Sequence, residues 1–161
     1  MTTFETADDA TKTLASRIIE YHHPDLMEAD ILILMRSPPA KSKGQEVLGK
    51  ARLSTPIERA LTGRDLAFTI ELQDEWWSTA KASQKEALLD HELCHCVGEP
   101  GAKGETEWSL RGHDIEEFFA IVERHGSWSE AVSGVKRALQ MDLFRGVGVT
   151  HDMRTGEVVE A

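Results

Sequence analysis

The sequence has little of several features that would mark other classes of protein. It contains only two cysteines in 161 residues, Cys94 and Cys96. They lie too close together in one predicted helix to cross-link distant parts of the chain, which excludes a disulfide-built secreted domain. No segment approaches the run of about 18 apolar residues that a membrane-spanning helix needs. The acidic N-terminus, Met1 to Ala10, lacks the hydrophobic run of a secretory signal. These absences predict a cytoplasmic protein with no membrane partner.

Positive charge is also scarce. The chain has 18 Lys and Arg against 28 Asp and Glu, a formal net charge of -10. Binding to DNA or RNA depends on neutralising phosphates, so this balance argues against a nucleic-acid partner. A length of 161 residues with 40% apolar content is typical of one domain with its own core.

The strongest chemical signal is the stretch from His91 to His95, which reads His-Glu-Leu-Cys-His. Residues four apart lie on one face of a helix, so both imidazoles reach one zinc ion at about 2.0–2.1 Å. Glu92 is turned by about 100° around the helix axis and stays outside the coordination shell. In sites of this form such a Glu takes the proton from the metal-bound water. The stretch predicts metal-assisted hydrolysis, with Glu92 as the general base.

The neighbouring sequence supports a helix here. Residues 84–90 are strong helix formers, and an apolar stripe follows helical steps at Leu89, Leu93, Cys96 and Val97. Asp74 can cap the start, and Gly98 supplies a stop. We therefore expect one long helix from Asp74 to about Cys96.

A catalytic zinc ion needs a third protein ligand. Proteases of the form H-E-x-x-H-x-x-G-x-x-H are excluded, because their next ligand position is Gly101 in this chain. The better candidate is His113, placed in the first turn of a second helix over residues 112–125 that Gly126 ends. Glu116 and Glu117 are the competing ligands.

Other polar residues receive weaker interpretations. Cys94 and Cys96 are expected to be small buried or half-buried helix residues, although a redox role for Cys94 is conceivable. His22 and His23 are adjacent, face different directions and are expected on the surface. Arg111, His125 and Tyr21 are alternative donors to a developing oxyanion, and the sequence does not choose among them.

The order of elements predicts an α+β fold. Helices are expected at residues 7–22, 56–61 and 128–143, besides those of the metal site. Strands are expected at residues 31–35, 46–53 and 66–72, with loops at 41–44 and 99–107 and a C-terminal tail from Gly146 that frays. The sheet has three strands or more and packs on the helix that carries His91.

This arrangement resembles the zincin superfamily, and most closely the phage metallopeptidases and the SprT-like proteases. The resemblance covers roughly residues 28–125 and is carried by four segments: Gly49-Lys50-Ala51, Ile70-Glu71-Leu72, His91 to His95, and Gly112-His113. It implies a single zincin-like domain over residues 1–161, with the helices at 7–22 and 128–143 packed on the core. It also implies a zinc ion on His91, His95 and His113, and a peptide substrate lying along the Gly49–Ala51 strand.

The predicted function is therefore a zinc-dependent metallopeptidase, with a protein or peptide as its partner and the cytoplasm of a phage host as its location. The chain has no basic module after the core, so the DNA-linked substrates of SprT-like relatives are not expected. Two alternatives stay open: a zinc-stabilised binding module without chemistry, and a zinc hydrolase acting on a non-peptide amide. An exposed strand edge beside the metal favours peptides, whereas a closed pocket favours small molecules. The oligomeric state stays unknown.

Overall fold

The computed structural model describes residues 1–161 except 117, 146–148, 152–157 and 161. The chain forms two compact units, Met1–Gly112 and His113–Ala161. Helices and strands alternate in the first unit, which confirms the predicted α+β class. Within the described residues, no helix combines the length and the apolar character needed to cross a bilayer. The single domain predicted over the whole chain remains a prediction.

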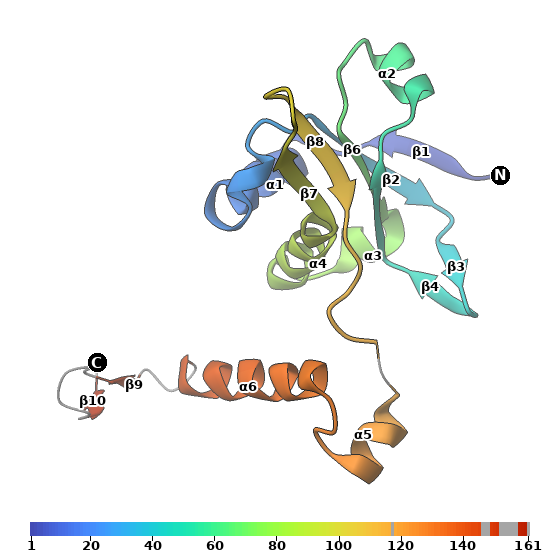
Figure 1. Cartoon of the computed structure of the whole chain (residues 1–161). Coiled ribbons are helices and arrows are strands. Elements are labelled where there is room, and N and C mark those ends of the chain that lie inside the picture. The colour runs from blue at the N-terminus through green and yellow to red at the C-terminus, as the bar shows by residue number, and fades with distance from the viewer. Residues whose placement is uncertain (117, 146–148, 152–157, 161) are drawn as a thin grey trace. The chain divides into compact units, whose positions relative to one another are not determined.

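The first unit is built on a four-stranded sheet with the order β1-β2-β6-β5. Figure 1 labels three of these strands, β1, β2 and β6. β2 and β6 run parallel, and the other two pairs are antiparallel. The strands are β1 (Thr3–Thr6), β2 (Ile31–Ser37), β6 (Phe68–Gln73) and β5 (Gly49–Leu53). The predicted strands at 31–35 and 66–72 are confirmed, with boundaries shifted by one or two residues.

The central strand β6 alternates between an apolar and a polar side. Phe68, Ile70 and Leu72 are completely buried in the hydrophobic core, together with residues of the helices. Thr69, Glu71 and Gln73 are also buried but point to the opposite face, as the two-residue period of a strand requires. There the Glu71 carboxylate accepts hydrogen bonds from Arg52 at 3.0 Å and from Arg36 at 3.4 Å. The buried carboxylate of Glu71 is therefore paired with two guanidinium groups.

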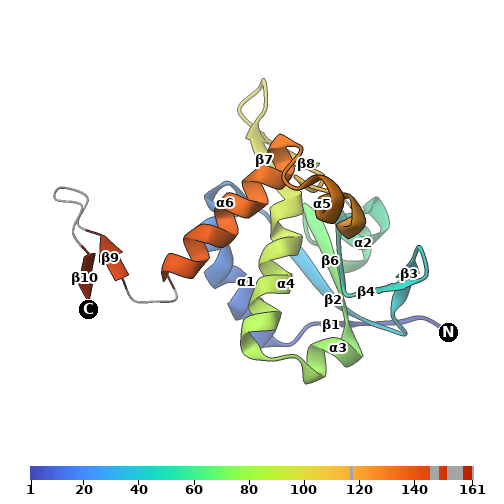
Figure 2. The same cartoon turned by 90° about the horizontal axis from the view of Figure 1, so that it is seen from below.

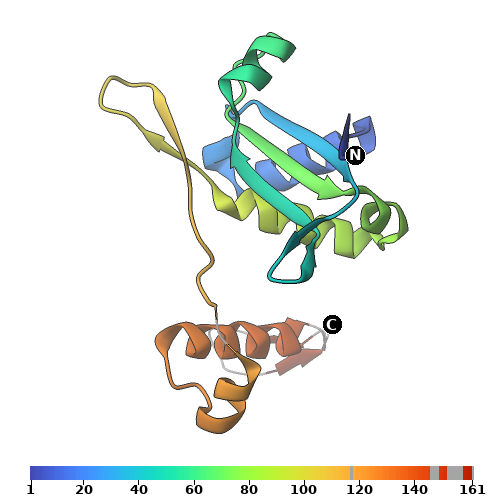
Figure 3. The ribbon, with the colours of Figure 1, turned by 90° about the vertical axis from the view of Figure 1, so that its right-hand side faces the viewer.

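Two helices cover the apolar side of the sheet, α1 (Asp9–His22) and α4 (Ala82–His95). Figures 2 and 3 show them side by side on this face. Asp8 caps α1 by accepting a hydrogen bond from the Thr11 amide at 2.8 Å, and the hydrogen bonds to Thr11 lower the pKa of its carboxyl group. Ile18 of α1 and Leu89 and Leu93 of α4 are buried in the core. The helix predicted at residues 7–22 is confirmed.

The long helix predicted from Asp74 to Cys96 is wrong. The structure has two helices, α3 (Asp74–Thr79) and α4, separated by extended backbone at Ala80 and Lys81. The hydroxyl groups of Ser78 and Thr79 donate to the Glu75 carbonyl at 2.8 and 3.2 Å, and such side-chain bonds compete with helix propagation. The cap is also one residue earlier than predicted, because the Gln73 side chain accepts from the Trp76 amide at 2.7 Å.

The loop predicted at residues 99–107 is confirmed at residues 101–105 but is wrong at both ends, which belong to strands. α4 ends at His95, and the chain continues directly into a hairpin of β7 (Cys96–Pro100) and β8 (Thr106–Leu110). Gly98 is a strand residue here and not a helix cap. A Cβ atom at Gly98 would lie 2.5 Å from Trp108 Cζ3 and 2.7 Å from the Asp25 carbonyl oxygen, so this position needs glycine for close packing.

A second hairpin replaces the loop predicted at residues 41–44. It joins β3 (Ala40–Ser42) to β4 (Gln45–Val47) through Lys43 and Gly44, which both have positive φ. This conformation is typical of a two-residue hairpin turn. The strand predicted at residues 46–53 is consequently divided between β4 and β5. The helix predicted at residues 56–61 is confirmed as α2 (Pro56–Thr62), with a capping box between Thr55 and Glu58.

The second unit contains α5 (Phe119–His125), α6 (Glu130–Arg145), β9 (Val149–His151) and β10 (Val158–Glu160). The helix predicted at residues 112–125 is wrong in its start, since α5 begins only at Phe119 and His113 lies in the segment before it. Its end is confirmed, because the Gly126 amide donates to the Val122 carbonyl at 2.8 Å with a φ of 64°. α6 confirms the helix predicted at residues 128–143. In the tail β9 and β10 pair with each other, and the other residues beyond Arg145 lie outside the described ones.

Leu93→Ala should lower the free energy of unfolding by about 2–5 kcal/mol, since it opens a cavity where α4 meets the sheet. Leu61→Ala is the matched control: Leu61 is 82% exposed on α2, and its loss should cost less than about 0.5 kcal/mol. Urea unfolding followed by circular dichroism measures both. Equal effects of the two substitutions would contradict the assignment of Leu93 to the core.

Candidate metal centre

The last turn of α4 carries the two histidines of the predicted metal site. The rings of His91 and His95 lie 5.1 Å apart between centroids and are inclined at 82°. Their spacing of four residues places them on one face of the helix, while Leu89 and Leu93 hold the adjacent face in the core. The packing of α4 therefore positions both imidazoles at the surface of the first unit.

A hydrogen bond orients the ring of His95. Its Nδ1 lies 2.8 Å from the carbonyl oxygen of Arg111. A carbonyl group only accepts, so Nδ1 carries the proton and Nε2 carries the lone pair that a metal ion requires. Such a partner for the second ring nitrogen is typical of metal-binding histidines.

The chain after β8 is fixed to the end of α4 by two further bonds. The Arg111 amide donates to the His95 carbonyl at 2.9 Å, and Arg111 Nε donates to the Cys94 carbonyl at 2.6 Å. His113 follows Arg111 by two residues, and two residues of chain span at most about 7 Å. His113 therefore follows closely on the part of the chain that is fixed to α4.

The three predicted ligands form a group that could hold a metal ion. One ligand atom each of His91, His95 and His113 lies within 4.8 Å of the others. Glu116 belongs to neither group of potential metal ligands found among the described residues, and Glu117 lies outside those residues. His113 lies in an irregular segment before α5, and not in the first turn of a helix as the sequence predicted.

Glu92 is buried, with only 3% of its surface exposed. Loss of solvation raises the pKa of its carboxyl group, while His95 and a hydrogen bond from the Ala51 backbone lower it. Desolvation is the largest of these effects, and a raised pKa suits a group that accepts and returns a proton.

The carboxyl group of Glu92 lies against β5. A Cβ atom at Gly49 would lie 2.8 Å from Glu92 Cδ and 2.9 Å from Cγ, and would also collide with Oε1. Only a glycine leaves room for this carboxyl group beside the strand. The sequence marked Gly49 through a family resemblance, but nothing in the sequence alone showed that it faces Glu92.

A groove of about 460 Å³ lies between β5 and α4. Its walls come from β5 and the residue before it, from α3 and from α4: Leu48, Gly49, Trp76, Gln84, Ala87, Leu88, His91 and Glu92. The sequence analysis missed Trp76 and Gln84, whose contribution depends on the break between α3 and α4. The groove joins the predicted general base to one predicted ligand and to the edge of the sheet.

The strand β5 is the outer strand of this sheet, and among the described strands it pairs with β6 alone. The Gln73 amide donates to the Leu48 carbonyl, and the Ser54 amide donates to the Ala67 carbonyl. Backbone groups alternate in direction along an antiparallel pair. Even-numbered residues of β5 therefore bond toward β6, and the backbone groups of Gly49 and Ala51 face away from it, with the Ala51 amide directed at Glu92.

The two cysteines differ from each other. Cys96 is buried, and burial raises the pKa of its thiol to about 12, so it stays protonated. The thiol donates to the Glu92 carbonyl over 3.6 Å. Cys94 is half-buried, as expected. Among the predicted oxyanion donors, Arg111 is engaged with the Cys94 carbonyl, and Tyr21 is 72% exposed on α1 and absent from the groove lining.

Comparison with known families shows to which family the chain belongs. The sequence model of the family described as "Putative phage metallopeptidase" matches residues 2–140. The chain belongs to this family. No curated protein and no solved structure matches the chain. Membership of the phage metallopeptidases confirms one of the two predicted resemblances and implies a metal ion and a protein or peptide substrate, while the likeness to SprT-like proteases stays a prediction.

Gly49→Ala should displace the carboxyl group of Glu92 and lower peptide cleavage by about a hundredfold, the contribution of a positioned general base. Metal affinity should stay unchanged, because neither histidine moves. Gly134→Ala is the control, since a Cβ there meets nothing closer than Arg137 Nη2 at 3.8 Å. Cleavage of a fluorescent peptide library and zinc titration measure the two effects. Full activity of Gly49→Ala would contradict the close approach of Gly49 to Glu92.

Proposed function

We propose that this chain is a zinc-dependent metallopeptidase in which His91, His95 and His113 hold the metal ion and Glu92 acts as the general base. The observation that carries the proposal is the buried carboxyl group of Glu92, held between the histidine helix and the edge strand beside a groove. A site that only stabilised the fold would gain nothing from a desolvated carboxyl group at this position.

The residues present fit a zinc ion. Three imidazoles are a common protein ligand set of catalytic zinc, and the group of three lies within 4.8 Å. The orientation of His95 by the Arg111 carbonyl matches the outer hydrogen bonds of such sites. When bound, zinc supplies Lewis-acid chemistry, which lowers the pKa of a water molecule and polarises a carbonyl group.

Glu92 moves the proton in this proposal. Its carboxylate takes a proton from the attacking water and then gives it to the nitrogen of the departing amine. Burial raises its pKa and thereby improves it as a base, while the Ala51 amide keeps one carboxylate oxygen in place. Position and protonation are thus controlled by the same environment.

The substrate is a peptide in extended conformation. The backbone groups of Gly49 and the carbonyl group of Ala51 face away from β6, and an extended peptide pairs with exposed edge groups of this kind. The groove beside them is lined by apolar groups such as Leu48, Trp76 and Leu88, which accept side chains of the peptide. An open strand edge favours this substrate over a small amide, which would need a closed pocket.

The biological setting follows from the family and remains part of the proposal. A phage-encoded enzyme without a membrane-crossing helix among its described residues would act in the cytoplasm of the host. A catalytically silent binding module is the competing function. The first of the next two experiments tests the third ligand, and the second separates a binding module from a peptidase.

His113→Ala should lower zinc affinity by at least about tenfold. Removing a residue that only hydrogen-bonds to a metal ligand already costs about this much, and removing a ligand should cost no less. Isothermal titration should be done in a Cys94→Ser background, so that this thiol binds no metal. His125→Ala is the control, because His125 lies in α5 and in neither group of potential ligands. Undiminished affinity of the His113 variant would assign the third ligand to another residue.

Glu92→Gln keeps the size of the side chain but removes its basic oxygen. The variant should fold and bind zinc, and peptide hydrolysis should fall by at least about a hundredfold. Mass-spectrometric detection of cleaved peptides measures the rate, and thermal unfolding checks the fold. If Glu92→Gln cleaves as fast as the unmodified chain, the peptidase mechanism is wrong and the binding-module function is favoured.

A further inference from the structure

A second set of metal-binding side chains lies on another face of α4. Asp90 and Cys94 are four residues apart, as are His91 and His95, but each is one position earlier. One residue of helix corresponds to about 100° of rotation. Two pairs with ligand spacing therefore lie on adjacent faces of one helix, and the histidine site uses only one of them.

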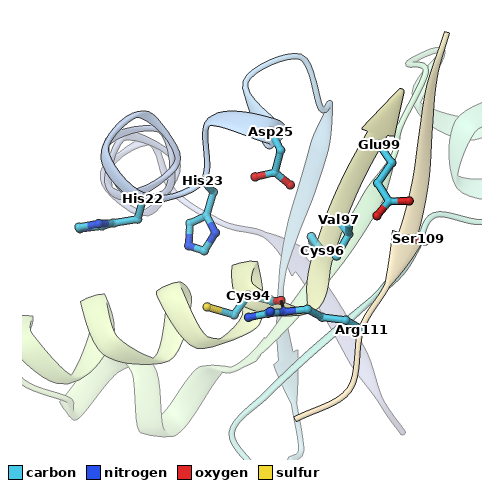
Figure 4. Close-up of a pocket in the computed structure, with 9 residues that line it drawn as sticks. All are labelled: His22, His23, Asp25, Cys94, Cys96, Val97, Glu99, Ser109 and Arg111. Atoms are coloured by element: carbon cyan, nitrogen blue, oxygen red, sulfur yellow. Dashed lines mark hydrogen bonds between the residues drawn. The ribbon is translucent and has the colours of Figure 1, made fainter. Parts of the chain in front are cut away.

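His23 completes this second set. It follows the last residue of α1, and its Nε2 lies 2.6 Å from Asp90 Oδ1, with only 11% of the side chain exposed. In Figure 4 its ring points toward α4 and Cys94, whereas His22 points away. The predicted surface position is thus wrong for His23. One ligand atom each of His23, Asp90 and Cys94 lies within 4.8 Å of the others.

An ion pair explains only part of this arrangement. The contact of His23 with Asp90 accounts for two of the groups but not for the thiol beside them. Nitrogen, carboxylate oxygen and sulfur together are the donor set of zinc, whereas calcium and magnesium select oxygen alone. Ligand atoms in a tetrahedral zinc site lie about 3.3–3.8 Å apart, so a small opening of the 2.6 Å contact accommodates the ion.

The site has room for a fourth ligand. His23 and Cys94 both line an open pocket of about 590 Å³, together with residues such as Asp25 and Arg111 (Figure 4). Asp25 accepts a hydrogen bond from the Gly98 amide at 3.2 Å, and Arg111 is bonded to the Cys94 carbonyl. Both are already engaged, so water from the pocket takes the fourth position.

We propose that His23, Asp90 and Cys94 form a second zinc site, separate from the histidine site and independent of the proposed peptidase activity. The bound ion links the end of α1 to α4, the helix that carries the H-E-x-x-H residues. A ligand that binds only the folded state stabilises it, so occupancy of this site raises the stability of the first unit.

Cobalt(II) tests the site, because a thiolate bound to cobalt gives a charge-transfer absorption in the near ultraviolet and imidazoles do not. Addition of Co²⁺ to the metal-stripped, reduced full chain should produce this absorption, and Zn²⁺ should abolish it. Cys94→Ser should remove it, and His23→Ala or Asp90→Ala should weaken cobalt affinity by at least about tenfold. The His91→Ala/His95→Ala double variant should retain it, as should Cys96→Ala.

Several outcomes overturn the proposal. No charge-transfer absorption in the unmodified chain means that no thiolate ligand exists. If the absorption is lost in the His91→Ala/His95→Ala variant, Cys94 is a ligand of the histidine site. If cobalt affinity is unchanged in both His23→Ala and Asp90→Ala, these two residues are not ligands. Circular dichroism of each variant identifies any that fails to fold. Cys94→Ser nearly preserves the shape of the side chain and leaves His91 and His95 unchanged. Its result therefore does not depend on whether the proposed peptidase activity is correct.

Discussion

The contact between Glu92 and the edge strand is the constraint on which the rest of the site depends. The carboxyl group of Glu92 is buried away from water, and a backbone amide of β5 and the nearby His95 compensate part of this cost. This contact fixes the distance between α4 and the sheet, because any residue larger than Gly49 would collide with the Glu92 side chain. The ligand face of the helix, the groove and the exposed strand edge are all positioned by this one approach.

The end of α4 is organised by a second constraint, the return of the chain through Arg111. The backbone and side chain of this residue bond to the carbonyl groups of Cys94 and His95, which the helix leaves without partners in its last turn. The same residue orients the ring of His95. The β7–β8 hairpin is therefore more than a connection, since its far strand brings the following residues back to the helix from which it started.

Much of this could be predicted from the sequence, because local patterns carry it. The motif from His91 to His95, the strand at residues 31–35 and the helix at residues 7–22 follow from spacing and propensity. The failures lie where individual side-chain contacts, local or distant, decide the structure. The break between α3 and α4 depends on hydroxyl bonds to Glu75, and the strand position of Gly98 depends on Trp108. The sequence predicted a surface position for His23, because it does not show that the fold brings Asp90 beside this ring.

α4 is only weakly amphipathic, and this limits what an isolated copy of the helix can reproduce of the site. Only Leu89, Glu92 and Leu93 of its 14 residues are buried, and the other residues of its last turn carry polar side chains. A helix of this length with so little apolar surface is marginal in water, because most of its stability comes from the surface it packs against. A synthetic peptide with this sequence would be largely unfolded and would offer its donors to metal ions as a flexible chelator. The selectivity of the centre thus belongs to the sheet as much as to the motif.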